Sequence, residues 1–180
     1  FFPNGFAMYI YAEALMNREC DYEAVLADYL QHIYGDAWQE ARDYLQKVTD
    51  LFDFACEKAS DPYHEVNFYN PDYARRLSGV KELAAEGRAL ALKHLSMPTR
   101  PQTLSMRLLL RHAEYIEGMA EFLKEKALGN DKAAEERFEA FLESFGKYEW
   151  ELERYLDHNL MARSLHIIIR RPTVTLVEGM

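Results

Sequence analysis

The sequence predicts an all-α protein, a bundle of about six mostly antiparallel helices in a single helical domain that spans residues 1–180. Apolar residues recur at helical spacing in one segment after another, and glycine, proline or asparagine separates these segments. The clearest case is a stripe whose steps alternate between four and three residues: Ala134, Phe138, Phe141, Phe145, Tyr148, Leu152, Tyr155 and Asn159. A chain of 180 residues, of which 49% are hydrophobic, is large enough to bury one core.

The first predicted helix covers residues 5–16 and is apolar on every side except at Glu13. Such a helix needs burial on several faces, which a short terminal helix of a small domain rarely receives. The sequence also starts at Phe1 without an initiator methionine. We therefore expect a C-terminal fragment of a larger protein, whose residues 1–18 pack against an upstream part.

The second and third helices are predicted from their caps. Asp21 is expected to cap a helix over residues 22–34, and Gly35 to end that helix in the left-handed conformation. Asp36 is then expected to cap a third helix, which the apolar spacing extends to about residue 59.

The middle of the chain begins with an aromatic-rich loop over residues 60–71, which we expect to be held against the core. Asn70 and Pro71 provide the cap and first position of a fourth helix, to about residue 95. A turn with two prolines at 97–101 precedes a fifth helix that ends near residue 128. Glycine inside a helix costs up to ~1 kcal/mol relative to alanine. We therefore expect close helix–helix approaches at Gly79, Gly87, Gly118 and Gly146.

The apolar stripe predicts a sixth helix that starts after Asn130 and continues unbroken to Asn159, a length of ~40 Å. We expect the other helices to pack along it. Residues 161–166 are compatible with a last short helix. Residues 167–169 and 174–177 have strand composition, so a small hairpin and a short extended C-terminal tail are both open.

Composition excludes several classes of partner. The net charge of −9 and the absence of a basic stripe argue against nucleic acid. No apolar run is long enough to span a membrane, and no signal peptide is visible. The two cysteines form no disulfide framework, which slightly favours the cytoplasm but leaves the location undetermined.

No catalytic, cofactor-binding or metal-binding motif occurs in the sequence. None of the six histidines follows a glutamate three residues earlier, so the di-iron signature of helical bundles is missing. The HExxH, CxxC, GxGxxG, Walker and GxSxG patterns are also missing. We accordingly assign no catalytic residue, cofactor or metal ligand to this chain.

Five residues remain as ligand or interface candidates, most of them with a plainer alternative. His158 and Asn159 end the stripe beside an aspartate and could orient a ligand, whereas a histidine at a helix C-terminus is also favoured by the helix dipole. Glu13 could be a buried carboxylate with a raised pKa, or could reach the surface and pair with a nearby arginine. Tyr69 could stack on a sugar together with neighbouring aromatics (Tyr63, Phe68 and Tyr73), although aromatics more often fill a core. Asn17 ends the apolar first helix.

Residues 5–44 resemble a known family. The matching positions run from an aromatic helix through a spaced aspartate to a Tyr-Gly-x-Ala turn: Tyr9, Tyr11, Leu15, Met16, Asn17, Asp21, Val25, Leu26, Tyr29, Leu30, Tyr34, Gly35, Ala37 and Tyr44. This pattern resembles the C-terminal helical region of domain-of-unknown-function 4838 proteins, which are glycoside-hydrolase-like and similar to α-glucuronidases and β-hexosaminidases. Met16 and Arg18 stand where tryptophan and proline are common in that pattern.

The resemblance implies that residues 1–18 are the last helix of an upstream (β/α)8 barrel, and that the remaining residues form a helical domain beside it. Because the catalytic carboxylates of such enzymes lie at barrel strand ends, the resemblance assigns none to this chain. We expect a non-catalytic accessory domain of a carbohydrate-active glycoside hydrolase, with the upstream catalytic domain as partner and carbohydrate as a further ligand. The alternative is a self-contained interaction module, including a homodimer formed through the first helix.

Overall fold

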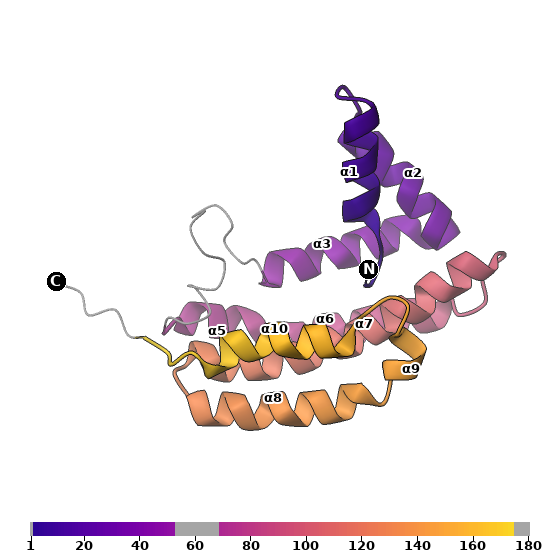
Figure 1. The fold of residues 1–180 in the computed structure, drawn as a ribbon. Helices are drawn as coiled ribbons and strands as arrows, with labels where there is room; N and C mark the ends of the chain where they lie inside the picture. The colour runs from indigo at the N-terminus through magenta and orange to yellow at the C-terminus, as the bar shows by residue number, and fades with distance from the viewer. Residues whose placement is uncertain (1, 53–68, 175–180) are drawn as a thin grey trace.

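The structure, a computed structural model, describes residues 2–52 and 69–174. These residues form helices and no strand, which confirms the predicted all-α class (Figure 1). The third predicted helix is described as far as Phe52, so its expected end near residue 59 lies outside the described residues. Tyr63 and Phe68, two members of the predicted aromatic group, also lie outside them.

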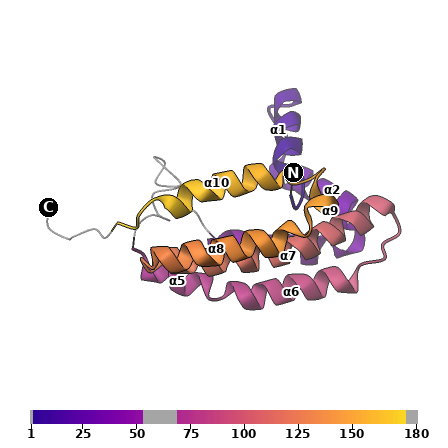
Figure 2. The same cartoon turned by 60° about the horizontal axis from the view of Figure 1, so that its bottom comes forward.

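The centre of the bundle is α7 (Arg100–Ala127), a helix of 28 residues. Its most extensive contacts are with α2 (Tyr22–Tyr34), α5 (Pro71–Leu77), α6 (Val80–Lys93) and α8 (Asp131–Gly146). Figure 2 shows α7 and α8 side by side, with α5 and α6 along one side of them and α10 (His158–Arg170) along the other. The helices therefore gather around α7, not around the stripe after Asn130.

The second helix forms as predicted because its signals are local. The carboxylate of Asp21 accepts hydrogen bonds from the backbone nitrogens of Glu23 and Ala24, and Gly35 has a φ of 53°. A short 3-10 turn, η1 (Gly35–Ala37), separates α2 from α3 (Trp38–Phe52). The predicted cap at Asp36 therefore falls inside this turn.

The predicted continuous helix after Asn130 is wrong. Helix α8 ends at Gly146, a single turn α9 (Glu149–Leu152) follows, and α10 starts at His158. The Asp157 side chain caps α10 by accepting a hydrogen bond from the Leu160 nitrogen at 2.8 Å. The stripe correctly predicts which side chains are buried, because Phe138, Phe141, Phe145 and Leu152 all lie in the core.

Two further predicted elements change. The fourth helix is divided into α5 and α6 near Ser78, whose hydroxyl donates to the backbone oxygen of Ala74 at 3.1 Å. Residues Ile167–Ile169 belong to α10, so the prediction of a strand at this position is wrong. The short helix predicted at residues 161–166 is part of this longer helix. The extended tail is described only through Val174, whose oxygen accepts a hydrogen bond from the Tyr69 nitrogen at 3.0 Å.

Interior glycines mark two close helix contacts. A Cβ added to Gly87 would overlap the Tyr44 ring, and one added to Gly118 would overlap the Phe141 ring. These positions join α6 to α3 and α7 to α8, as expected. A Cβ at Gly79 or Gly146 would meet only ordinary van der Waals neighbours, the nearest at 3.5 and 3.6 Å, so the prediction of a close approach is wrong there.

Candidate functional site

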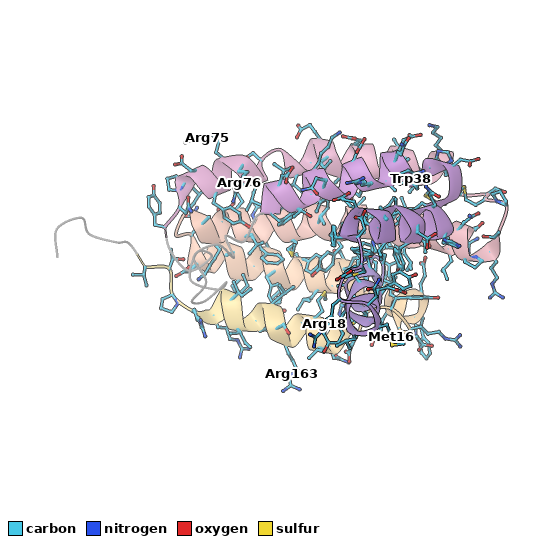
Figure 3. All side chains as sticks on the ribbon, turned by 90° about the horizontal axis from the view of Figure 1, so that it is seen from above. Met16, Arg18, Trp38, Arg75, Arg76 and Arg163 are labelled. Atoms are coloured by element: carbon cyan, nitrogen blue, oxygen red, sulfur yellow. The ribbon has the colours of Figure 1, made fainter. Side chains whose placement is uncertain are left out.

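Helix α1 (Phe6–Met16) is apolar and uncovered. None of its residues is buried, and its large apolar side chains are exposed: Met8, Tyr9, Tyr11, Leu15 and Met16. The last two have exposed fractions of 68% and 88%. In Figure 1 the helix rises from the bundle beside α2, and Figure 3, which looks down on it, places Met16 and Arg18 near the end that leads into α2.

The base of α1 is fixed to the bundle by aromatic side chains. The Phe6 ring packs against Tyr22 and Tyr29, with centroids 5.6 and 5.5 Å apart, and the Gly5 nitrogen donates to the Tyr29 hydroxyl at 2.9 Å. Just before the helix, Phe2 packs edge-on against His112 and Tyr115 of α7. These contacts present the helix as a rigid arm whose outer surface has no cover among the described residues.

Two predicted candidates, Glu13 and Asn17, lie on this arm. Glu13 is half-buried, and its charge raises the pKa of the exposed Tyr9 phenol. Asn17 is exposed at the end of α1, where its side-chain oxygen accepts a hydrogen bond from the Glu19 nitrogen at 3.1 Å. Both residues lie on or at the end of α1, next to its exposed apolar side chains.

The other candidates lie elsewhere in the fold. His158 is the first residue of α10, so the interpretation of a histidine stabilised at a helix C-terminus is wrong. Asn159 follows it and is exposed. Tyr69, with an exposed fraction of 49%, precedes α5 near one end of the bundle, whereas α1 rises from the other half (Figure 1). The structure therefore does not bring the five predicted residues into one site.

Tyr73 does not contribute to the predicted sugar-stacking group of aromatic side chains. This ring is only 6% exposed, and its hydroxyl donates to the backbone oxygen of Phe52 at 3.3 Å. Tyr73 thus fills the core, the alternative raised for these aromatics.

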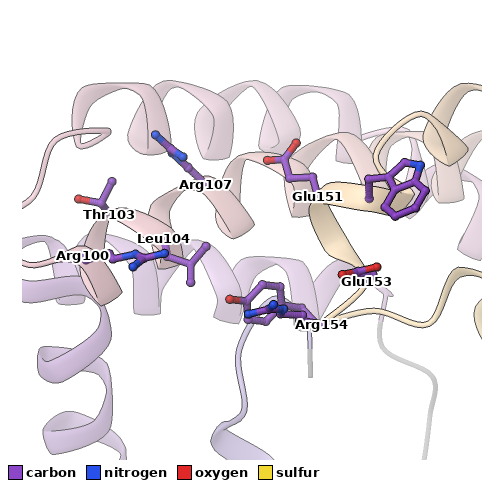
Figure 4. Close-up of a pocket in the computed structure, with 9 residues that line it drawn as sticks. Arg100, Thr103, Leu104, Arg107, Glu151, Glu153 and Arg154 are labelled. Atoms are coloured by element: carbon purple, nitrogen blue, oxygen red, sulfur yellow. The ribbon is translucent and has the colours of Figure 1, made fainter.

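A pocket of about 690 Å³ lies between the start of α7 and the connection from α9 to α10 (Figure 4). One wall consists of four residues at helical spacing on α7: Arg100, Thr103, Leu104 and Arg107. The other wall comes from a short stretch of the α9 region: Trp150, Glu151, Glu153, Arg154 and Tyr155. The volume is in the range of small-molecule sites.

Of the charged side chains around this pocket, a glutamate forms an ion pair, whereas the arginines that line the pocket form none among the described residues. Glu151 accepts a hydrogen bond from Arg111 at 3.1 Å, and the Arg111 guanidinium lies 3.9 Å from the centre of the Tyr148 ring. Burial lowers the pKa of Arg111, but Glu151 and Glu114 outweigh this effect, so its pKa is raised and it stays charged. The pocket arginines have no ion-pair partner within residues 2–52 and 69–174.

Sequence reasoning missed this pocket, although one signal was present. Trp150 stands between two glutamates on the polar side of the apolar stripe, and in the structure its exposed fraction is 87%. A large aromatic side chain on a polar face is more informative than one on the stripe, because core packing does not explain it.

A second cavity, of about 320 Å³, lies beneath α1 between α2 and α3. Its walls are largely apolar, and His112 of α7 reaches it from the core. Burial lowers the pKa of His112 to about 4, so the ring is neutral at neutral pH. Its Nδ1 lies 3.4 Å from the hydroxyl of Tyr44, whose own pKa is raised by burial.

The described residues show neither a metal-binding cluster nor a membrane-spanning helix. No group of three histidine, cysteine, aspartate or glutamate side chains there is arranged to hold a metal ion. No helix in that part of the chain is long and apolar enough to cross a bilayer.

Comparison of the chain with protein-family models, with curated proteins and with solved structures finds no significant match in any of the three.

Proposed function

We propose that this chain is a non-catalytic helical accessory domain that supports a neighbouring catalytic domain of the same polypeptide and docks against it through α1. The observation that carries the proposal is the exposure of α1, an apolar helix without a single buried residue. Burying one large aliphatic or aromatic side chain contributes roughly 1.5–3 kcal/mol. Covering several side chains of α1 would therefore stabilise a domain–domain contact substantially.

The length and the attachment of α1 also fit this role. A helix of 11 residues is marginal alone in water. Here the Phe2 and Phe6 rings fix its base to α7 and α2, while the Leu15 end remains uncovered. A fixed base and an exposed apolar end, which the turn at residues 17–21 joins to α2, are suited to packing against the helices of an adjoining domain.

The nature of that domain is inferred from the resemblance of residues 5–44. If α1 completes a (β/α)8 barrel, the parent protein is a carbohydrate-active glycoside hydrolase and its catalytic carboxylates lie at the barrel strand ends. The helices from α2 onward would then buttress the barrel.

The first experiment replaces Leu15 and Met16 together by glutamate. The isolated chain should keep its free energy of unfolding within about 0.5 kcal/mol, because both side chains are exposed. The longer polypeptide carrying the same changes should lose stability or yield a separable catalytic domain in limited proteolysis. Matched replacement of the exposed Leu92 of α6 by glutamate should change neither. Docking through α1 would be refuted if the longer polypeptide and its Leu15→Glu, Met16→Glu variant had equal stability and equal protease resistance.

A second experiment tests the non-catalytic role directly. The isolated chain is assayed on aryl glycosides, and no turnover is expected. Turnover that disappears in Glu13→Gln or His158→Asn would overturn the proposal.

A homodimer is the competing use of the same surface. Sedimentation of the isolated chain separates the two, because a dimer through α1 would dissociate in the Leu15→Glu, Met16→Glu variant. A monomer at high concentration is the outcome that favours docking within one polypeptide.

A further inference from the structure

We propose that the pocket between α7 and the α9–α10 connection binds a small organic oxyanion that carries a ring. Arg100, Arg107 and Arg154 would hold its phosphate, sulfate or carboxylate group, and the ring would lie against Trp150. This inference does not depend on docking through α1.

The three arginines approach the pocket from two separate elements. Arg100 and Arg107 are seven residues apart, two turns along one face of α7, and Arg154 comes from the opposite wall (Figure 4). Like charges placed around one hollow repel each other, and this repulsion is relieved when an anion binds between them. Guanidinium groups are well matched to oxyanions, because they donate paired hydrogen bonds in a fixed plane.

Other arginines of the chain form ion pairs, unlike these three. Carboxylates are plentiful, since the net charge of the chain is −9. Arg137 lies 2.9 Å from Glu121 and 3.1 Å from Glu125, and Arg88 pairs with Glu117. In the pocket, Glu151 is already bonded to Arg111. Among the described residues, Glu153 is then the one pocket carboxylate with no ion pair, against three such arginines.

The end of α7 adds to the positive potential. The helix begins at Arg100, and the N-terminus of a long helix carries the equivalent of roughly half a positive charge. The hydroxyl of Thr99 caps the Gln102 nitrogen at 3.4 Å, so the first turn is fixed in place. This field supports the site but would not define it without the arginines.

The apolar part of the lining specifies the rest of the ligand. Trp150 is 87% exposed, and Leu104 and Tyr155 also line the hollow. An indole face offers a large flat surface on which an aromatic or sugar ring can stack. A bare inorganic ion would leave this surface in water, so a ring next to the charged group should add affinity.

The proposal is tested by titrating the chain with four probes and following heat release and tryptophan fluorescence. Phenyl phosphate and glucose 6-phosphate carry the anion on an aromatic and on a sugar ring, inorganic phosphate carries the anion alone, and glucose carries the ring alone. At least one ring phosphate should bind saturably and about tenfold more tightly than inorganic phosphate, and glucose should not bind. The tighter of the two identifies the ring. If neither ring phosphate binds saturably, or if glucose binds equally well, the proposal is overturned.

Variants connect the binding to the pocket. Arg107→Ala with Arg154→Ala should weaken the bound ring phosphate at least about tenfold, because each arginine supplies charge-assisted hydrogen bonds. The matched control is Arg18→Ala with Arg75→Ala, two exposed arginines outside this pocket that are labelled in Figure 3. Trp150→Ala should weaken ring phosphates but not inorganic phosphate. Equal losses in the Arg18/Arg75 control would show non-specific attraction and refute the site.

Discussion

The ammonium of Lys126 is fully buried and lies 2.6 Å from Oδ1 of Asp131, at the corner between α7 and α8. The same Nζ donates to the backbone oxygens of Ile169, at 3.3 Å, and Arg171. Asp131 in turn accepts from the Thr173 nitrogen at 2.9 Å. One buried cation therefore ties the end of α10 and the segment after it to the central helices.

The first prediction concerns this pair. Asp131→Asn should lower the free energy of unfolding by about 2 kcal/mol at pH 7, because it leaves a buried ammonium without its counter-charge. This value is below that of a fully buried pair because the Asp131 side chain is 40% exposed. Urea denaturation of the parent and the Asp131→Asn variant measures this change in the free energy of unfolding. The control is Glu136→Gln, since Glu136 lies 3.8 Å from Lys132 in an exposed pair that should contribute less than about 0.5 kcal/mol.

The Asp131 contribution should also depend on pH. Burial raises the pKa of Asp131, but hydrogen bonds from Lys126 and Thr173 outweigh it and hold the pKa below its ordinary value. The stability it contributes is therefore complete above the unfolded carboxyl pKa of about 3.9 and is lost as the pH falls through the lower folded pKa. The difference between the parent and Asp131→Asn should narrow only in that acid range. A difference that already narrows between pH 7 and 5 would contradict this assignment.

The second prediction concerns His112. Its folded pKa of about 4 lies below the ordinary value of about 6.5, so between these two values the unfolded chain binds more protons than the folded chain. Stability should fall as the pH is lowered through this window, by about 3 kcal/mol relative to His112→Asn. Denaturation of both proteins at pH 7.5 and 4.5 measures the effect. His32→Asn is the control, because the His32 side chain is 75% exposed and its replacement should leave the pH dependence of stability unchanged. If the stability of His112→Asn depended on pH as that of the parent does, the prediction would be refuted.

The third prediction uses two glycines of the same region. Gly87→Ala should destabilise by about 1–3 kcal/mol, because the new methyl group would overlap the Tyr44 ring. Gly79→Ala should change stability by less than about 0.5 kcal/mol, since its nearest neighbour would be the Arg76 oxygen at 3.5 Å. Thermal denaturation of the two variants compares them. Equal effects would mean that the contact between α3 and α6 is looser than described.

Sequence reasoning succeeded where the determinants are local. The Asp21 cap, the positive φ at Gly35 and the Asn70 cap of α5 each depend on neighbouring residues, and all three are confirmed. It failed at residues 146–158 because Tyr148 and Leu152 continue the apolar spacing although the helix is interrupted before and after the single turn α9. Periodicity records which side chains face the core, and a short turn can preserve that direction while breaking the helix.

The pocket could not be predicted for a different reason. Arg100 and Arg154 are separated by a large part of the chain, and no sequence motif records that α7 and the α9 region meet. The predicted candidates Glu13 and His158 were chosen for their immediate neighbours, and the structure places them on different helices. Local chemistry thus located the exposed arm but not the pocket.

The proposal of a docking arm is tested most directly by amide hydrogen exchange at α1. In the isolated chain its amides should exchange much faster than those of α7, because no side chain of α1 is buried. In the longer polypeptide, with the neighbouring domain present, the α1 amides should become protected, and Leu15→Glu with Met16→Glu should remove that protection. Exchange at α1 that is equally fast with and without the neighbouring domain would contradict the account.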